Sequence, residues 1–360
     1  MSEDIFISVV IPFYKTIDKD FEFVEKAIKS VANQPYKNTE ILLINDGSPE
    51  NIDAFGKEMV EKYPALRYFS KENEGVGAAR NFGIQNAKGN FIAFLDHDDI
   101  WVNGFLDDET ITALNNGSDM FAFSYYGCSA DFKRGKIIKV SPKTVEGGGL
   151  NAVNSLWNSH SSILYRRQML IDNNIGYAVS RRNEDEIFRH KCLYVSKKIT
   201  FIDKPMFLYR NNINSETHKR IKVEELYGNL LKSWVELLEW HNENYPDDKQ
   251  SIDFVKWMIC VYAIEGIQVL YQSKRPLEEM EKVAEKYLCK DYIYKYKDLA
   301  FDDHKFEMQE YTDNYQEFIK KNKAIGTKKR IKSAISAIPL LRTIYERKKY
   351  QIILDESLYI

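Results

Sequence analysis

Three acidic side chains follow one apolar run in the stretch FLDHDD. Asp96, Asp98 and Asp99 come directly after the residues FIAFL at 91–95. Carboxylates this close repel one another by about 3 kcal/mol per pair at an effective dielectric of about 20, so we expect a cation among them. Carboxylate oxygens suit Mg²⁺ and Mn²⁺, which are commonly shared with substrate phosphates. The stretch therefore predicts a divalent-cation site at Asp96 and Asp98, with an acidic solvated turn as the alternative.

The other two residues of this stretch have local roles by expectation. Asp99 is expected to cap the next helix in part, because aspartate is a preferred N-cap residue. His97 lies between Asp96 and Asp98 in an extended segment, so alternation directs it away from them, toward solvent or core packing.

A further acid, Asp46, ends a second apolar run in LLINDGSPE. A carboxylate at the end of a strand can accept hydrogen bonds from a ribose or from a base N–H. The alternative is a turn or cap, because Asp-Gly-Ser is a common turn sequence.

Glycines open a third segment, KENEGVGAARNFGI. Gly75 and Gly77 permit close backbone approach, and the N-terminus of the following helix offers free N–H groups to a phosphate. Arg80 adds a cation one turn later. The spacing matches neither the dinucleotide-binding glycine pattern nor a P-loop. A plain helix start with glycines is the alternative.

Two later segments contain candidate catalytic or ligating residues. RRNEDEIFRH places Glu184 and Asp185 in the first turn of an expected helix, where acids are also ordinary partners of the helix dipole. LYRNNINSETH ends in His218, which is either a metal ligand or a structural histidine.

Strands and helices alternate over the first hundred residues, which predicts a parallel α/β sheet. Ligands bind such sheets beyond the carboxyl ends of the strands, where Asp46 and Asp96 lie. The expected strands are 5–12 (stopped by Pro12), 40–45, 66–69 and 90–95, and the expected helices are 21–33, 51–63 and 75–87. The expected elements that follow are helix 103–115, strand 119–127, an irregular stretch 131–150, helices 166–174 and 184–195, and strand 199–209.

Only helices are expected after about residue 220, at 222–244, 251–273 and 276–288. This change predicts three parts: an α/β domain over 1–219, a helical module over 220–322, and a basic C-terminal segment over 323–360. Residues 323–349 contain nine basic residues against one acid. Apolar residues recur there every three or four positions, so the segment is expected to lie on an anionic membrane surface. A helix packed on the protein is the alternative.

Composition excludes several classes of protein. The formal net charge of −2 over 360 residues argues against nucleic acid as a partner. The four cysteines form no CxxC pair, which argues against a zinc site or a disulfide framework. The N-terminus lacks the basic start and long apolar core of a signal peptide, and no apolar stretch is long and uncharged enough to predict a membrane span. We expect a cytoplasmic location, with peripheral attachment to the inner face of the membrane.

Taken in order, five stretches resemble the inverting family 2 glycosyltransferases of GT-A fold, a large group that builds bacterial surface polysaccharides. The resemblance covers about residues 6–215. The stretches are ISVVIPFYK, LLINDGSPE, NEGVGAARNFGIQNAKGNFIAFLDHDDIW, WNSHSSILYRR and NEDEIF. One departure is that PFYKTIDKD lacks the Tyr-Asn that usually follows the first strand in that family.

The resemblance implies a metal-dependent enzyme with Mn²⁺ or Mg²⁺ as cofactor. It implies transfer of a sugar from a nucleotide-sugar, expected to be a UDP-sugar, to a hydroxyl of a glycan or lipid-linked acceptor. Asp98 would bind the metal, Asp96 the metal and the ribose or sugar, and Asp185, paired with Glu184, would deprotonate the acceptor. The other residues implied are Pro12, Phe13, Tyr14, Asp46, Gly75 and Arg80 at the nucleotide, and His218 at the metal.

Two other classes of protein remain open from the sequence. A sugar-phosphate nucleotidyltransferase also uses acids on a parallel sheet, but it usually has a glycine-rich basic loop after the first strand, and PFYKTID has no glycine. A non-catalytic nucleotide-sugar-binding module would be expected to have lost the acids, yet Asp46, Asp96, Asp98 and Asp185 are all present.

Overall fold

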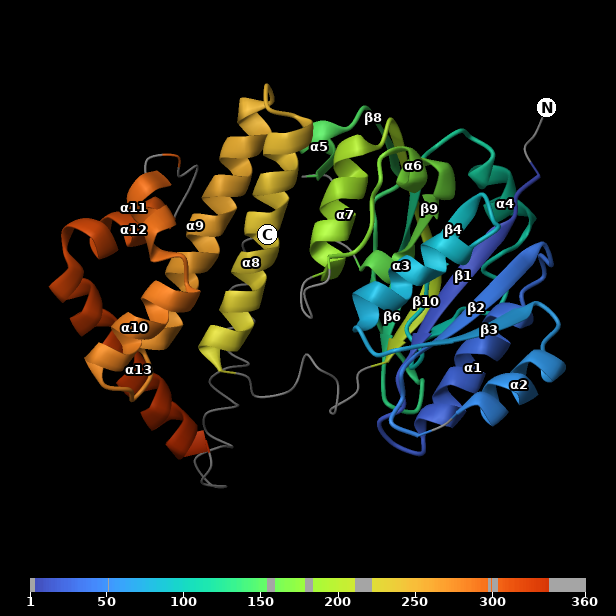
Figure 1. Ribbon diagram of the computed structural model, residues 1–360, viewed down its shortest axis with the longest axis horizontal. Coiled ribbons are helices and arrows are strands. Elements are labelled where there is room, and N and C mark those ends of the chain that lie inside the picture. Colours follow the sequence, from blue (N-terminus) through green and yellow to red (C-terminus); the bar gives the residue numbers. More distant parts are fainter. Residues whose placement is uncertain are drawn as a thin grey trace. The chain divides into compact units, whose positions relative to one another are not determined.

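The computed structural model describes residues 4–50, 52–153, 159–178, 184–210, 222–296, 299 and 304–336, except for the side chains of 304–307 and 328–336. The chain divides into two compact units, Met1–Arg220 and Ile221–Ile360 (Figure 1). The first is an α/β unit and the second is helical in its described residues.

The first half of the α/β unit alternates strand and helix as predicted. Its sheet order is β3-β2-β1-β4, and all three pairings are parallel. The elements are β1 (Ile7–Phe13), α1 (Asp20–Ala32), β2 (Thr39–Asp46), α2 (Asp53–Lys62), β3 (Leu66–Lys71), α3 (Val76–Asn86) and β4 (Phe91–Phe94).

The second half of the unit completes a mixed sheet. The order continues β4-β9-β6-β10-β5; β9 is antiparallel to both neighbours, whereas β6 and β10 are parallel. The elements are β5 (Ile100–Trp101), α4 (Asp108–Leu114), β6 (Met120–Cys128), β7 (Arg134–Ile138), β8 (Lys143–Glu146), α5 (Gly149–Val153), β9 (Ile163–Arg166), α6 (Arg167–Asp172), α7 (Glu184–Val195) and β10 (Lys198–Arg210).

The prediction of an irregular stretch at 131–150 is wrong. It holds the short strands β7 and β8, which pair antiparallel with β6 and β10, and the start of α5. Both strands are mostly exposed, so they lack the apolar alternation by which a half-buried strand is recognised.

The helix expected at 103–115 begins later, at Asp108. Asp107 is its N-cap, because the Asp107 carboxylate accepts the N–H of Thr110. The expected cap at Asp99 is therefore wrong: Asp99 instead accepts the N–H of Arg210 at 2.8 Å.

The strand that was expected to stop at Pro12 continues through it to Phe13. The backbone hydrogen-bonding groups of Val10 and Pro12 face β4. Val10 lies opposite Phe94, the last residue of β4. Pro12 therefore lies beyond the end of β4, where its missing N–H breaks no ladder hydrogen bond.

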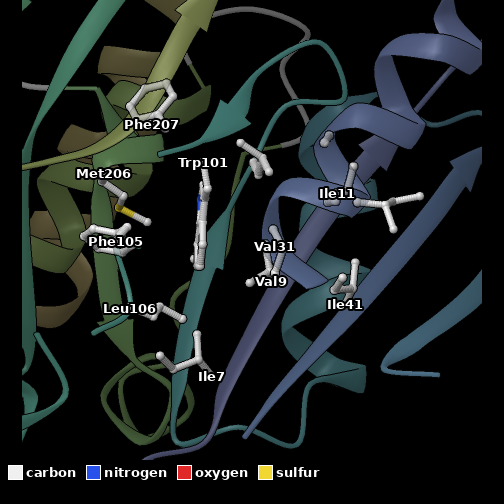
Figure 2. Packing of buried hydrophobic residues seen from close by; sticks show 14 of the residues in the cluster. Ile7, Val9, Ile11, Val31, Ile41, Trp101, Phe105, Leu106, Met206 and Phe207 are labelled. Carbon is white, nitrogen blue, oxygen red and sulfur yellow. The ribbon is translucent and has the colours of Figure 1, made fainter. Parts of the chain in front are cut away.

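The sheet separates two apolar clusters, because side chains alternate between its faces. On one face Ile7, Val9 and Ile11 pack with residues of α1 and α4 and with Trp101 (Figure 2). On the other face Val10 packs with residues of α3, α6 and α7. Two rigid layers of helix thus fix the strands whose ends form the site.

The helical unit has α9 in contact with each of its other helices, and these contacts fix its core. Its helices are α8 (Val223–Asn244), α9 (Lys249–Tyr271), α10 (Leu277–Tyr287), α11 (Lys290–Tyr296), α12 (His304–Asp313) and α13 (Tyr315–Ser336). α9 is long and apolar enough to cross a membrane, but many of its apolar side chains are buried within this unit.

The helix α13 continues without a break through residue 322, after which the basic C-terminal segment was predicted to begin. Gly326 brings α13 close to the end of α9, since a Cβ there would lie 2.2 Å from the carbonyl oxygen of Gln272. Most of the predicted membrane-binding stretch, residues 337–360, lies outside the described residues.

Candidate active site

The carboxyl ends of β1, β2 and β4 form one edge of the parallel half of the sheet. The chain leaves β1 toward β2 on one side and β4 lies on the other, so the order reverses at this point. Such a reversal opens a crevice in which α/β proteins bind ligands. Asp46 is the last residue of β2, and only Leu95 separates Asp96 from the end of β4. Both acids therefore lie at this edge, as predicted.

Arg80 joins two of the predicted acids. Its guanidinium donates to Asp96 Oδ1 at 2.9 Å and to Glu184 Oε1 at 3.0 Å. The Arg80 side chain is buried and lies over the ring of Tyr177. Burial alone raises the pKa of Asp96, but the charge of Arg80 outweighs it and holds that pKa below its usual value.

Asp98 and Asp99 both contact Arg210, the last residue of β10. Arg210 donates through Nη2 to Asp98 Oδ2 at 2.8 Å and through Nε to the Asp98 carbonyl at 3.0 Å. Burial, followed by the nearby Asp98 charge, raises the pKa of the Asp99 carboxyl well above its usual range. Two arginines, together with the raised pKa of Asp99, therefore reduce the electrostatic repulsion within the acid cluster.

His97 points away from the neighbouring acids, as predicted. Its ring packs against Phe13 at a centroid distance of 5.4 Å, and its Nε2 lies 3.9 Å from Asp20 Oδ1. Burial lowers the pKa of His97, but the nearby Asp20 carboxylate and then the Asp98 charge raise it overall. This contact fixes the start of α1 against the turn that contains Asp96 and Asp98.

Asp46 holds the loop that leads into α3. Its carboxylate accepts the N–H groups of Glu74 at 3.2 Å and Gly75 at 2.9 Å, and the Lys71 ammonium at 3.0 Å. A carboxylate has about four acceptor positions, so one remains for a ligand. The predicted contact with a nucleoside stays a prediction.

Two glycines shape this loop. Gly47 has φ of +63°, and a Cβ there would lie 2.5 Å from the backbone nitrogen of Asn73. Gly75 has φ of +98° with open space around the position of a Cβ. Both conformations favour glycine, and at Gly47 the neighbouring backbone also excludes any side chain.

Asp185 faces a histidine that was not among the residues expected at the site. His160 Nδ1 lies 3.4 Å from Asp185 Oδ2, and the His160 ring is buried among Phe94 and Tyr177. Burial raises the pKa of Asp185, but the hydrogen bond and charge of His160, together with Arg80, hold it well below its usual range. Asp185 is thus an ionised, oriented carboxylate.

The sequence signal for His160 is weak. It lies in WNSHSSILYRR, in a one-turn 3₁₀ helix before β9, a strand that the sequence pattern does not predict. The sequence predicts no helix or strand that would position this histidine. Its contact with Asp185, at the start of α7, therefore could not be predicted.

The remaining predicted nucleotide contacts lie at the end of β1. The Pro12 and Phe13 side chains are buried, and the Phe13 ring packs in the core with Phe21 and Phe55. Only Tyr14 is exposed among the three. His218, the predicted third metal ligand, lies outside the described residues.

Asp96 and Asp98 fit a divalent cation by their chemistry. Each gives one carboxylate oxygen to an arginine, and its other oxygen makes no hydrogen bond within the described part of the chain. Both side chains are partly open to solvent, with exposed fractions of 34% and 22%. The described residues contain no group of three or more metal-ligating side chains, so other ligands would come from the substrate or from residues outside them.

Residues 8–173 match the family model described as glycosyl transferase family 2. These 166 of the 360 residues are therefore assigned to glycosyl transferase family 2. The matched residues include Asp46, Arg80, Asp96, Asp98 and His160, and they end before Glu184 and Asp185.

Several curated proteins are similar to this chain over part of its length. It is 25% identical over 225 residues to the uncharacterized glycosyltransferase EpsJ of Bacillus subtilis, covering 59% of this chain and 62% of EpsJ. It is 40% identical over 133 residues to an uncharacterized glycosyltransferase of Rickettsia felis, covering 37% of this chain and 21% of that protein. It is 26% identical over 261 residues to glycosyltransferase GlyA of Streptococcus pneumoniae, covering 68% of this chain and 36% of GlyA. The matches thus span less than two thirds of these relatives.

A solved structure shares the fold over most of the chain. The crystal structure of S. aureus TarS residues 1–349 in complex with UDP-GlcNAc superposes with a TM-score of 0.66 at 19% sequence identity. The match covers 90% of this chain and 91% of that chain. The GT-A fold with a C-terminal helical region is therefore confirmed.

Proposed function

We propose that this protein is an inverting glycosyltransferase that moves a sugar from a nucleotide-sugar to a hydroxyl of a glycan or lipid-linked acceptor in the synthesis of cell-surface polysaccharide. The match of residues 8–173 to glycosyl transferase family 2 supports the reaction class. A UDP-sugar is the proposed donor, and the fold shared with a protein solved in complex with UDP-GlcNAc supports this choice.

One observation carries the proposal. Arg80 contacts both Asp96, beside the expected donor diphosphate, and Glu184, next to the expected base Asp185. Donor-side and acceptor-side acids, 88 residues apart in the chain (184 − 96), are therefore fixed in one site. A non-catalytic binding module would need the donor-side acid, but it would not need an oriented carboxylate on the acceptor side.

The chain's own residues support a single displacement. Asp185 is ionised and held by His160, so it can take the proton of an acceptor hydroxyl as that oxygen attacks the anomeric carbon. One base suffices, because attack from the face opposite the leaving group inverts the anomeric centre in a single step. The proton ends on the Asp185 carboxylate and is then lost to water.

A divalent cation held by Asp96 and Asp98 would supply charge stabilisation to the leaving nucleoside diphosphate. We expect Asp98→Asn to abolish transfer and EDTA to do the same, because a neutral amide is a poor ligand for Mg²⁺ or Mn²⁺. Binding of Mn²⁺ alone, measured by electron paramagnetic resonance, should weaken in the same variant. Full transfer in EDTA would contradict the metal requirement.

The reaction class is tested by its products. The protein is incubated with Mn²⁺ and a panel of nucleotide-sugars without acceptor, and slow release of free UDP is expected. Release of pyrophosphate from a nucleoside triphosphate and a sugar phosphate would instead show a nucleotidyltransferase. Binding of a nucleotide-sugar without any turnover would indicate a non-catalytic module.

His160 is proposed to position and polarise Asp185. We expect the acidic limb of the pH profile of kcat to move to higher pH in His160→Gln, because the pKa of Asp185 rises once its partner is lost. In the unaltered protein the base stays ionised until the pH falls through that lowered pKa. A uniform loss of activity with no movement of the limb would show that His160 is only structural.

We also propose that the protein acts in the cytoplasm, at the inner face of the membrane, through its basic C-terminal segment. Liposome co-sedimentation of the whole chain and of a version ending at residue 336 tests this. The whole chain should bind anionic vesicles more strongly, because the shorter version keeps only five of the nine basic residues of the segment. The later end point leaves α13 intact, whereas a cut at residue 322 would remove its second half. Equal sedimentation of the two versions would rule out residues 337–360 as the anchor.

A further inference from the structure

A groove lies on the face of the sheet opposite α7. Its cavity volume is about 490 Å³, and it is lined by α1, by β5 and the two residues after it, by Leu208 of β10, and by Phe132 and Arg134 at the start of β7. Asp185 belongs to α7, on the other face, so the groove is not the base-side part of the site.

The groove combines positive charge with apolar surface. Lys26, Lys29 and Arg134 line it, and none of the three forms an ion pair with any residue that the structure describes. No described residue that lines the groove is acidic. Three cations around one concavity favour an anionic ligand, because no acidic side chain lines the groove beside them.

An aromatic residue is held over the groove at some cost. Phe132 has φ of +61°, a conformation rare for a bulky side chain. Two hydrogen bonds close its loop, from the Ser129 N–H to the Lys133 carbonyl and from the Phe132 N–H to the Ser129 carbonyl, each at 3.0 Å. The Lys26 ammonium lies 5.8 Å from the ring centroid of Phe132. Strain of this kind at a fixed side chain points to function.

A series of side-chain contacts connects the groove to the acid cluster. Arg210, which binds Asp98, stacks on Phe23 at 3.9 Å, and the Phe23 ring lies 6.4 Å from that of Phe132. The side chains of Arg210 and Phe23 thus lie between Asp98 and Phe132. The groove therefore borders Phe23, whose ring contacts the arginine that binds Asp98.

We propose that this groove binds an anionic glycan chain, the acceptor of the transfer reaction, through carboxylate or phosphate groups on its sugars. The role of this glycan as acceptor rests on the proposed function, whereas its binding does not. Phe132 would stack on a sugar ring, while Lys26, Lys29 and Arg134 would neutralise the charges.

The test measures binding of alginate oligosaccharides, which are chains of uronates, and of uncharged dextran of the same length. Isothermal titration is carried out on the full chain at low and high salt. The unaltered protein should bind alginate and not dextran, and high salt should weaken that binding. Equal affinity for both glycans, or binding to neither, would overturn the proposal.

Two sets of substitutions with equal charge changes make the test specific. The groove set, Lys26→Ser, Lys29→Ser and Arg134→Ser, should weaken alginate binding by about tenfold or more. The control set changes three exposed lysines of the same unit outside the groove, and should leave binding within about twofold. That set is Lys19→Ser, Lys37→Ser and Lys57→Ser. Equal weakening by both sets would show unspecific attraction and overturn the groove assignment.

Phe132→Gly provides a variant that should not harm folding. Glycine adopts positive φ freely, so stability should stay or rise while alginate binding falls. Unchanged binding in this variant would contradict the stacking role.

Two further measurements distinguish glycan binding from membrane binding and from catalysis. Binding to phosphatidylglycerol vesicles but not to alginate would assign the groove to a membrane surface instead, and would overturn the proposal. Hydrolysis of the donor by the unaltered protein is measured separately. Its absence would count against the proposed function, whereas the alginate result tests the groove alone.

Discussion

Asp185→Asn is expected to lower turnover by about two to four orders of magnitude, the usual contribution of a general base. Donor binding should be retained, because asparagine keeps the shape of the side chain and can still accept from His160. Single-turnover kinetics with a UDP-sugar, together with equilibrium binding of the same donor, measure the two effects separately. If donor binding is lost as well, Asp185 is a donor-site or structural residue.

Glu184→Gln is the matched control for that experiment. The Glu184 side chain is only 10% exposed and is held by Arg80, whereas that of Asp185 is 42% exposed. An acceptor hydroxyl can therefore reach Asp185 more easily. A larger loss of turnover from Glu184→Gln than from Asp185→Asn would show that the base is the other acid of the pair.

Arg80→Met is expected to lower the free energy of unfolding of the α/β unit by about 3 kcal/mol, the lower end of the range for breaking a buried ion pair. The value is at the lower end because Asp96 is partly open to water. The change leaves Asp96 and Glu184 without their shared partner. For a unit of this size the melting temperature should fall by about 6–12 °C, as measured by calorimetry.

Lys62→Met provides the comparison at the surface. Lys62 pairs with Glu25, and both side chains are substantially exposed, with fractions of 51% and 34%. Its loss should change the free energy of unfolding by less than about 1 kcal/mol. Comparable losses from the two substitutions would mean that the Arg80 network contributes no more than an ordinary surface pair.

The parallel half of the sheet was predictable because β1, β2 and β4 are buried on both faces. Runs such as IFISVV and EILLIN are apolar almost without interruption, and turn residues bound them. The positions of Asp46 and Asp96 followed directly, since the end of each run fixes the sheet edge. Local sequence patterns therefore carried this part of the fold and of the site.

The antiparallel half was less predictable, for physical reasons. β9 has only four residues, and its pairing with β4 and β6 depends on partners far away in the chain. β7 and β8 are too exposed to show an apolar pattern. The contacts of Arg80 with Glu184, of His160 with Asp185, and of Arg210 with Asp98 all join distant segments, and no local pattern encodes them.

The order of strands in the sheet has a consequence for synthesis on the ribosome. β9 lies between β4 and β6 in the sheet. The backbone groups on that edge of the apolar strand β4 therefore stay unpaired until residues 163–166 have emerged. At about 5–20 residues per second this takes on the order of ten seconds after β4 itself is made. A nascent chain with an unpaired apolar strand is prone to associate with its neighbours.

A truncated version that stops at residue 173 would contain β9 but not β10, so β6 would lack its parallel partner. Slower synthesis at low temperature, or a chaperone that covers strand edges, should therefore raise the yield of folded protein more than a change of its surface charge.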